Sequence, residues 1–409
     1  MEKELRVLYF HQHFSTPKGA TGIRSYEMAI RLVKAGHEVT MVCGSYGGAD
    51  TGIESDFING SRRDVVDGIN VIEFDLAYSN KYGFLKRTES FIKFAVKSIG
   101  VAMTADYDIV FATSTPLTAG IPGIFARWLR AKTFVFEVRD LWPELPKEMK
   151  VITNPIVLGA MSILEWVSYH SAHKCIGLSP GIVDGIVKRG ISREEVVCIP
   201  NGCDLDIFSN AQKAARPSGV NEDDLMAIFT GTHGVANGLD MALNAAAVLK
   251  DKGRNDIKIV LVGQGKLKQK LIDRAKKEHL DNVIFIDPVP KDKLAEMLKC
   301  ADIGLQLLAN VSAFYRGTSP NKFFDYIASG LPVLNNYPGW LADQIEANDC
   351  GYVVPPDDPE SFADALIHAA ENKPKLQQMG LNGNKLAVRS YDRENLAKVW
   401  IKEVIEVNV

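Results

Sequence analysis

Short apolar runs alternate with amphipathic, helix-like stretches along most of the chain, and this alternation constrains the fold more than any other feature. The first repeat has an apolar run at 5–10, an amphipathic stretch at 23–35 and a second apolar run at 39–43. Strand, helix and strand in this order predict a right-handed parallel βαβ unit. A second series of such repeats starts at 225–230. We therefore predict an α/β fold.

The chain has 409 residues, which exceeds what one ordinary core accommodates and predicts two domains. The two series of repeats divide it into an N-terminal domain at 1–205 and a C-terminal domain at 206–392, each doubly wound and Rossmann-like. The pattern leaves open whether the closing helix at 393–409 packs back on the first domain. Because such sheets bind ligands beyond the carboxyl ends of their strands, we expect a ligand site in an interdomain cleft.

Composition disfavours several classes of function. A formal net charge of −3 provides no overall positive field, so we expect no nucleic-acid partner. The six cysteines are scattered without a Cys-x-x-Cys pair, which disfavours a zinc or thiol-exchange site. The first residues lack the apolar region of a signal peptide, and no apolar stretch is long enough for a membrane span. We expect a cytoplasmic protein that is soluble or lies on a membrane.

Two Asp-x-Asp triplets, at 106–108 and 204–206, are candidates for metal ligands. A hard cation needs several converging oxygens, whereas the first triplet leads into a predicted strand and the second lies in a predicted turn. We therefore expect neither triplet to bind a metal.

The segment at 319–332 is the strongest candidate for phosphate binding. Ser319 is suited to cap a helix and Pro320 to occupy its first turn. Free amides and the helix dipole at such a start attract a diphosphate. Lys322 and Asp325 share one helical face, so the ammonium is placed to reach phosphate and the carboxylate to accept hydrogen bonds from a ribose diol. An acidic residue near a helix start also serves as a simple cap, and spacing alone does not choose between these roles.

Two glycine-containing loops follow strands in the second half. Residues 231–238 join a strand to a helix, so their amides are candidates for a phosphate cradle, although glycines at such turns also serve geometry alone. Gly263 and Gly265 look like the start of a dinucleotide fingerprint, with Asp287 at the end of the next strand. Lys268 stands where the third glycine belongs and breaks that motif.

Polar residues also follow strands in the first half. In the run Glu137-Val-Arg-Asp-Leu-Trp-Pro-Glu144, Arg139 is a candidate for binding a phosphate and Asp140 for binding a sugar hydroxyl. The alternative is an Arg–Asp ion pair that fixes the loop. His11 and His13 end the first strand, where we expect them to line a substrate pocket rather than to bind a metal.

A stretch near 84–101 repeats apolar residues at helical spacing and places Lys86, Lys93 and Lys97 on another face. This pattern is typical of a helix that lies on anionic lipid, and also of an ordinary half-buried helix. Aromatic residues interleaved with lysine favour the membrane surface.

These stretches resemble family 4 of the retaining glycosyltransferases, which have GT-B architecture: two Rossmann-like domains with an interdomain cleft. The resemblance spans nearly the whole chain and rests on residues 18–22, 35–39, 136–144, 199–204, 261–265 and 320–332. The Arg-Asp-Leu-Trp-Pro-Glu run is most similar to the bacterial surface-polysaccharide branch, including N-acetyl-fucosamine transferases of O-antigen synthesis.

The resemblance implies transfer of an N-acetylated hexosamine or deoxyhexosamine from a UDP-sugar to a lipid-diphosphate-linked saccharide, in O-antigen or capsule synthesis. It implies front-face transfer, in which the leaving diphosphate takes the acceptor proton, so that no metal and no other cofactor is needed. A lipid-linked acceptor and the basic helix imply a peripheral position on the inner face of the plasma membrane. Two alternatives stay open: a sugar-nucleotide epimerase on the same scaffold, and a non-catalytic nucleotide-sugar-binding subunit.

The chain departs from the family at its donor-binding positions. Gly317 stands at the first of the family's two spaced glutamates, and Asp325, at the second, is expected to hold the ribose. Thr232 and Asn237 stand where the family has the arginine and lysine that bind the donor diphosphate. We therefore expect that role to fall to Lys322, the helix amides, and Arg316 or Lys266. The predicted catalytic residues are Asp140, Arg139 and His13. The predicted substrate-binding residues are Asp325, Lys322, Asn321, Pro320, Gly231, His233, Asn237, Gly265, Arg316 and Gly19.

Overall fold

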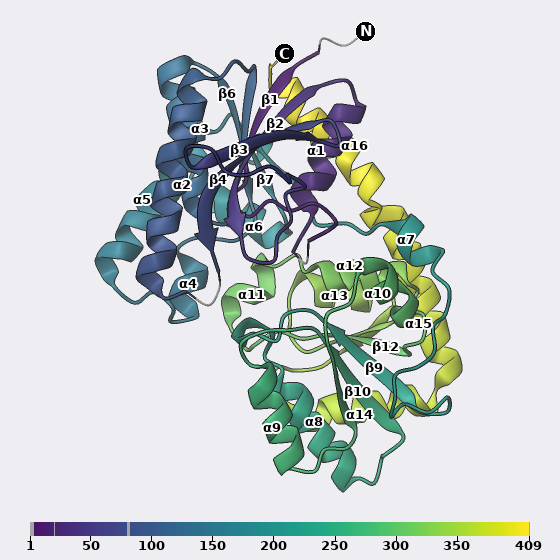
Figure 1. Ribbon diagram of the computed structural model, residues 1–409. Helices are drawn as coiled ribbons and strands as arrows, with labels where there is room; N and C mark the ends of the chain where they lie inside the picture. The colour runs from purple at the N-terminus through teal and green to yellow at the C-terminus, as the bar shows by residue number, and fades with distance from the viewer. Residues whose placement is uncertain (1–3, 20, 80–81, 409) are drawn as a thin grey trace. The chain divides into compact units, whose positions relative to one another are not determined.

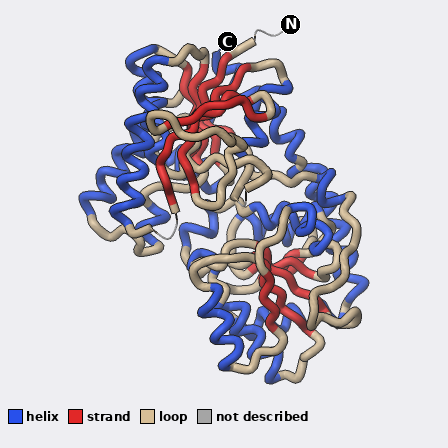
Figure 2. Tube along the Cα trace, in the orientation of Figure 1, coloured by secondary structure: helices blue, strands red, loops and turns tan. Residues whose placement is uncertain are grey.

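The structure, a computed structural model, describes residues 4–19, 21–79 and 82–408. The chain forms two compact units, each built on its own sheet (Figure 1, Figure 2). Unit 1 comprises Met1–Pro200, Gly317–Ser319 and Asn395–Val409, and unit 2 comprises Asn201–Arg316 and Pro320–Glu394. Two doubly wound sheets with covering helices confirm the predicted α/β fold.

The sheet of unit 1 has eight strands in the order β3-β4-β2-β1-β5-β6-β7-β8. Its neighbouring strands run parallel, except that β3 and β4 form an antiparallel hairpin. The strands are β1 (Arg6–Phe10), β2 (Glu38–Tyr46), β3 (Ser61–Val66), β4 (Ile69–Tyr78), β5 (Ile109–Thr113), β6 (Thr133–Val138), β7 (Lys174–Gly177) and β8 (Val196–Cys198). Strands such as β5 are buried throughout, because helices cover both faces of a parallel sheet, and this is why they appear in the sequence as continuous apolar runs.

Helices cover this sheet on both faces and give two apolar clusters. The helices are α1 (Arg24–Lys34), α2 (Phe84–Thr104), η1 (Leu117–Gly120), α3 (Ile121–Arg130), α4 (Glu144–Glu148), α5 (Pro155–Ser171), α6 (Pro180–Lys188), η2 (Arg193–Glu195), α16 (Arg393–Ile405) and η5 (Glu406–Asn408). The closing helix α16 packs on unit 1, because its fully buried Trp400 lies against the rings of Phe111 and Tyr9, with ring centroids 4.8 and 6.2 Å away.

The sheet of unit 2 has six parallel strands in the order β11-β10-β9-β12-β13-β14, the doubly wound order of a dinucleotide-binding fold. The strands are β9 (Leu225–Thr230), β10 (Ile257–Val262), β11 (Val283–Ile286), β12 (Ile303–Gln306), β13 (Val333–Asn335) and β14 (Gly351–Val353). The helices that follow or cover them are α7 (Leu205–Ser209), η3 (Val235–Asn237), α8 (Asp240–Asp251), α9 (Lys268–Lys277), α10 (Lys291–Leu298), α11 (Ser312–Gly317), α12 (Asn321–Ala328), α13 (Trp340–Ala347), α14 (Pro359–Glu371), α15 (Lys373–Leu386) and η4 (Ala387–Tyr391). Carboxyl ends of β9, β10 and β12 meet at the edge from which the glycine loops and α12 emerge.

The hairpin of β3 and β4 is an element that the periodicity did not predict. Its two-residue turn, Asp67 and Gly68, has positive φ at both positions, at 52° and 84°. Asp-Gly between β-prone runs is the usual signal of such a turn, so a search for turn residues would have found it. Within the described residues, no helix is long and apolar enough to cross a membrane.

Candidate functional site

The helix α12 begins beside the carboxyl end of β12 without a side chain bonded across its start. Pro320 is its N-cap residue and Asn321, which is exposed, is its first helical residue. The expectation that Ser319 caps the helix and Pro320 enters its first turn is therefore wrong by one residue. Proline offers no side-chain acceptor at the cap; the amide of Phe323 donates to the carbonyl oxygen of Pro320 at 3.2 Å, and the amides of Asn321 and Lys322 are left to an anionic ligand.

Lys322 joins this helix start to the loop after β9. Its Nζ donates a hydrogen bond to Oδ1 of Asn237, at 2.7 Å, and lies 4.3 Å from the ring centroid of Phe229. Gly231 lies beside the lysine, because a Cβ at that position would be in van der Waals contact with its Cε at 3.5 Å, and its φ of 141° is one that side chains rarely adopt. The structure thus brings three predicted binding residues together. Burial lowers the pKa of Lys322 to about 7.

Asp325 lies one turn further along α12, half-buried. In the part of the chain that the structure describes, its carboxylate makes no hydrogen bond and no ion pair. Burial raises its pKa to about 6, partly offset by the positive charges of Lys291 and Arg393. A half-buried carboxylate with open acceptor sites is suited to bind a ligand that brings its own hydroxyl donors.

The contacts of the nearby Asp204 show what one of the two Asp-x-Asp triplets does. Its carboxylate pairs with Lys291 and, at 2.6 Å, with Arg393, which holds its pKa below the usual range against the effect of burial. In the other triplet, Asp106 and Asp108 both pair with Arg6. In each triplet, therefore, aspartate side chains form ion pairs with lysine or arginine residues of the same chain. No cluster of three or more potential metal ligands occurs among the described residues.

The two glycine loops of unit 2 pack backbone against backbone. A Cβ on Gly263 would lie 1.9 Å from the carbonyl oxygen of Gly231, and one on Gly265 would lie 2.5 Å from that of His233. Close approach of the two loops is therefore a sufficient reason for these glycines. The side chain of His233 is fully buried near Phe229 and Phe285, and burial lowers its pKa to about 4, so only its backbone belongs to the loop surface.

Lys268 shows why the dinucleotide fingerprint fails. Its Nζ donates to the carbonyl oxygens of Gly263 and Ile286, at 2.9 and 3.1 Å, and pairs with Asp287 at 2.6 Å. The lysine ties the ends of β10 and β11 together and pairs with one oxygen of Asp287, whose side chain is otherwise exposed. The backbone of Arg316 lies in α11, and its side chain lies outside the described part of the structure.

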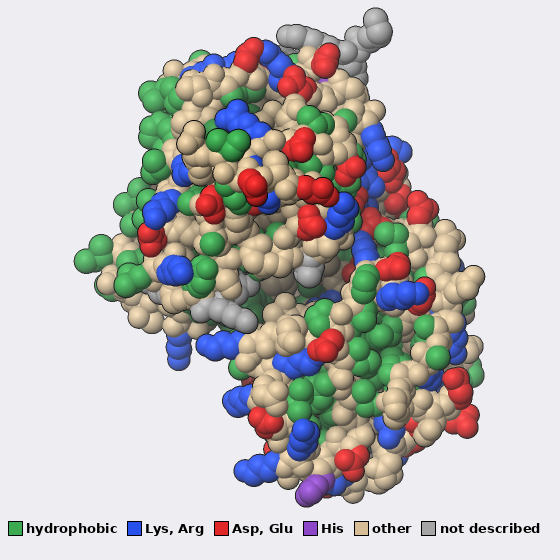
Figure 3. All heavy atoms as spheres, viewed as in Figure 1, with side chains coloured by type: hydrophobic (Ala, Val, Ile, Leu, Met, Phe, Trp, Pro, Cys, Tyr) green, Lys and Arg blue, Asp and Glu red, His purple; other side chains and the backbone are tan. Residues whose placement is uncertain are grey.

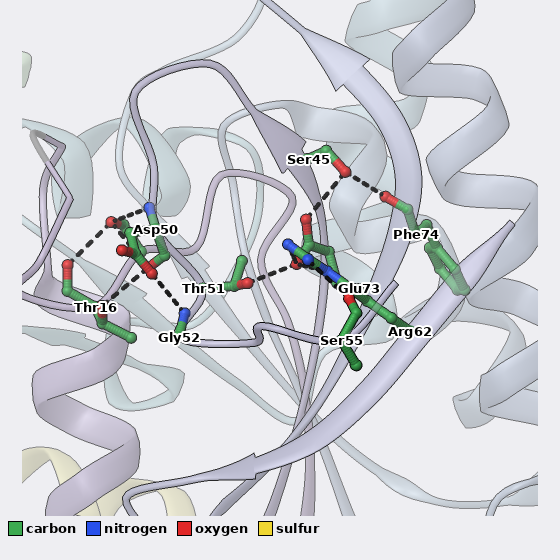
Figure 4. Close-up of polar contacts among 10 residues, drawn as sticks. Thr16, Ser45, Asp50, Thr51, Gly52, Ser55, Arg62, Glu73 and Phe74 are labelled. Atoms are coloured by element: carbon green, nitrogen blue, oxygen red, sulfur yellow. Dashed lines mark hydrogen bonds and ion pairs between the residues drawn. The ribbon is translucent and has the colours of Figure 1, made fainter. Parts of the chain in front are cut away.

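In unit 1 the loop that carries Gly19 is held by a dense polar network (Figure 4). Asp50 accepts hydrogen bonds through its carbonyl oxygen from the amide and hydroxyl of Thr16, at 2.7 and 2.9 Å. Nearby, Glu73 pairs with Arg62 at 2.9 Å and accepts a hydrogen bond from Thr51 at 2.5 Å. A Cβ on Gly19 would lie 2.2 Å from Ser15 Oγ, so the glycine is required by packing.

The polar residues at the end of β6 and directly after it differ in their contacts. Glu137 is fully buried and pairs with Arg24 at 2.8 Å, which also donates to the carbonyl oxygens of Ile199 and Pro200. Beyond this buried pair, the carboxylate of Asp140 accepts a long hydrogen bond from Thr115, at 3.4 Å, and burial raises its pKa. Among the described residues, Arg139 and Asp140 do not form an ion pair with each other, so the structure does not support the alternative that such a pair fixes the loop.

His13 lies against a cavity of 140 Å³ in unit 1. Its ring centroid is 4.5 Å from that of Tyr78, and burial lowers its pKa to about 3, so the imidazole is neutral. Arg87 and Trp142 also line the cavity. Nε2 of His13, Nε of Arg87 and Nε1 of Trp142 are buried, and none has a hydrogen-bond partner among the described residues. The sequence offered no signal for this cavity, because its walls come from four separate segments.

The helix α2 confirms a basic face but not the predicted separation of apolar and basic residues. Lys86, Lys93 and Lys97 are exposed, as the spacing indicates. Ile92 and Val96, two of the apolar residues of this repeat, are exposed beside the lysines. The outer face of α2 is therefore mixed, and its inner face, with Phe94, packs on the sheet.

Family models for glycosyl transferases group 1 and for a glycosyl transferase 4-like domain match residues 210–386 and 19–202. The two matches follow one another and together span most of the chain. The chain therefore belongs to the GT-B glycosyltransferases of family 4.

Individual proteins agree with this assignment. The chain is 24% identical over 241 residues to the colanic acid biosynthesis glycosyl transferase WcaI of Escherichia coli K12, a match that covers 58% of each protein. It spans only about half the length of the curated relatives that it matches. Sucrose-phosphate synthase from Thermosynechococcus elongatus has the same fold, with a TM-score of 0.75, 17% identity and 98% of both chains covered. HepE from Anabaena, in complex with UDP and glucose, has a TM-score of 0.68 at 14% identity, with 98% of this chain and 99% of HepE covered.

Proposed function

We propose that the protein is a retaining glycosyltransferase that moves a sugar from a UDP-sugar to a lipid-diphosphate-linked saccharide, in O-antigen or capsule synthesis. The observation that carries this proposal is the start of α12, where the half-buried amine of Lys322 and the unpaired carboxylate of Asp325 lie about one helical turn apart. The diphosphate would bind the open amides and Lys322, and the ribose diol would bind Asp325.

Lys322 supplies the charge that the loop after β9 lacks. Asn237 stands where the family resemblance expects a lysine, and the Nζ of Lys322 lies 2.7 Å from its side-chain oxygen. A cation contributed by α12 therefore reaches the position that a loop lysine would occupy. The replacement of the loop lysine by Lys322 supports donor binding although the usual arginine and lysine are missing. It disfavours the alternative that the protein is a non-catalytic subunit.

The chemistry proposed is front-face transfer. The leaving diphosphate takes the acceptor proton, and Lys322 and the helix amides stabilise the charge that develops on it. Such a reaction needs no metal and no dedicated base. Asp140 and Arg139, after β6, would bind hydroxyl and phosphate groups of the substrates, and neutral His13 would serve as a wall of the acceptor site rather than as a base.

The acceptor would bind the cavity beside His13. Its aromatic walls suit the face of a sugar ring, and the free Nε groups of Arg87 and Trp142 suit an anionic or hydroxyl oxygen. We propose that the sugar transferred is an N-acetylated hexosamine or deoxyhexosamine, and that the protein works on the inner face of the plasma membrane. The colanic acid relative and the UDP complex of HepE support this class of reaction.

The test begins with binding of UDP and a panel of UDP-sugars, followed by assay of transfer to a lipid-diphosphate saccharide. Lys322→Ala should weaken UDP binding at least tenfold, because a hydrogen bond to a charged group is worth about 1.5–3 kcal/mol. Lys277→Ala, which removes an exposed lysine from the far end of α9, is the matched control and should change little. Unchanged affinity in Lys322→Ala would overturn the donor site. Formation of an isomer from the UDP-sugar alone would identify an epimerase instead.

A further inference from the structure

The helix α5 of unit 1 buries its charged side chain and exposes apolar side chains, which is the reverse of an ordinary surface helix. A helix that half covers a core turns apolar side chains inward and charged ones outward. In α5 the only charged residue, Glu165, is 1% exposed, and it pairs with Arg189 at 2.9 Å and accepts a hydrogen bond from Tyr169 at 3.0 Å. The residues turned to solvent are apolar: Ile156, Ile163 and Trp166 are 80%, 67% and 47% exposed.

The adjacent helix α3 continues this surface. Its Trp128 and Leu129 are 63% and 64% exposed, and α3 packs against α5. The indole Nε1 of Trp128 donates to Ser171 Oγ at 2.9 Å, so the polar atom of the ring is satisfied while its apolar body stays exposed. Figure 3 shows hydrophobic side chains gathered along the side of unit 1 where Figure 1 places α2, α3 and α5. We define the α5 face as Ile156, Ile163, Trp166, Trp128 and Leu129.

We propose that the α5 face inserts into the boundary between the headgroups and acyl chains of a lipid bilayer. Large exposed apolar patches mark partner surfaces, and tryptophans with a satisfied polar atom are typical of the membrane interface. The proposal deepens the proposed function, on which its biological role rests, because it names the surface that would hold the enzyme beside a lipid-linked acceptor.

Charge at the border of the face favours lipid over a second copy of the chain. The guanidinium of Arg127 lies 5.1 Å from the ring centroid of Trp128, and the exposed lysines of α2 lie on the helix that packs against α3. Anionic headgroups complement these cations around an apolar centre. A second copy would bring the same cations to the contact, and like charges across an interface are unfavourable.

The experiment measures co-sedimentation of the full chain with vesicles of phosphatidylcholine and phosphatidylglycerol. We compare the wild type with the triple variant Ile156→Ser, Ile163→Ser, Trp166→Ser. Since these side chains are exposed, the variant should fold, and an unchanged circular dichroism spectrum and thermal unfolding midpoint would show that it has. The matched control replaces three exposed apolar residues of unit 2, Val235, Leu381 and Val388, with serine.

The wild type should stay bound in 1 M salt, where the screening length is only about 3 Å, because the contact is apolar. The triple variant should bind at least tenfold more weakly, and the control variant should bind as the wild type does. Equal binding by the triple variant would overturn the proposal, as would a wild-type dimer that the three serines dissociate. Vesicle binding needs no sugar transfer, so absence of transferase activity would contradict the proposed function and leave this inference standing.

Discussion

At the scale of single residues, one physical cause acts in opposite directions on the two charged groups of α12. Burial disfavours whichever form is charged, so it raises the pKa of Asp325 to about 6 and lowers that of Lys322 to about 7. Both groups therefore change protonation close to neutral pH. Perturbed groups of this kind cluster at functional sites, and this pair lies at a helix start with open amides.

The shift of Lys322 predicts proton uptake when UDP binds. In the free protein the amine is mostly neutral at about pH 8, above its pKa of about 7. A bound diphosphate favours the ammonium and raises that pKa, so Lys322 should take up nearly one proton when UDP binds at about pH 8, and almost none near pH 6, where it is already charged. Affinity should fall as the pH rises above 7.

Calorimetry in buffers of different ionisation enthalpy measures this uptake directly. Asp325 is ionised at about pH 8 in the free protein and contributes little there. Lys322→Arg is the control, because its guanidinium stays charged and should show no uptake. Binding of UDP to the wild type without proton uptake at about pH 8 would contradict a contact between Lys322 and the diphosphate.

At the scale of elements, the outer faces of α2 and α5 differ in kind. The exposed side of α2 mixes lysines with Ile92 and Val96, whereas the exposed side of α5 carries no Asp, Glu, Lys or Arg. We expect electrostatic attraction from the first and salt-independent insertion from the second.

The lysines of α2 therefore make a separate prediction. The triple change Lys86→Glu, Lys93→Glu, Lys97→Glu should weaken binding to anionic vesicles at low salt about a hundredfold, since each basic residue near such a surface contributes roughly 1 kcal/mol, and should leave the apolar contact of the α5 face in place. The same change at Lys270, Lys276 and Lys277, exposed on or beside α9 in unit 2, is the control. Undiminished co-sedimentation of the α2 variant at low salt would refute a role for this helix at the membrane.

At the scale of the whole molecule, the two units have separate cores and separate candidate sites. The apolar cluster of unit 2 lies around β9 and β10, and the proposed donor residues belong to that unit. The cavity beside His13 is lined by residues of unit 1 alone. We expect donor and acceptor recognition to be separable by mutation.

Arg87→Ala tests this division. Removal of the guanidinium from the cavity should raise the KM for the lipid-linked acceptor about tenfold or more, and the affinity for UDP should not change. Arg63→Ala, at an exposed position on β3, is the control. A loss of UDP affinity in Arg87→Ala, or an unchanged acceptor KM, would contradict the assignment of the cavity to the acceptor.

The sequence by itself determined the two doubly wound sheets, apart from the hairpin of β3 and β4, and a helix within 319–332, because apolar periodicity and turn residues act locally and encode strands and helices directly. It also predicted that Lys322 and Asp325 share one helix face, since their spacing on a helix is a local property. Only the tertiary structure decided which groups meet across segments: Lys322 with Asn237, Lys268 with Asp287, and the three unpaired nitrogens beside His13. The outward turn of the apolar side of α5 was likewise decided there, because the partner of Glu165, Arg189, lies in a separate segment, directly after α6. Periodicity shows that a helix has two faces, and only packing decides which of them meets the core.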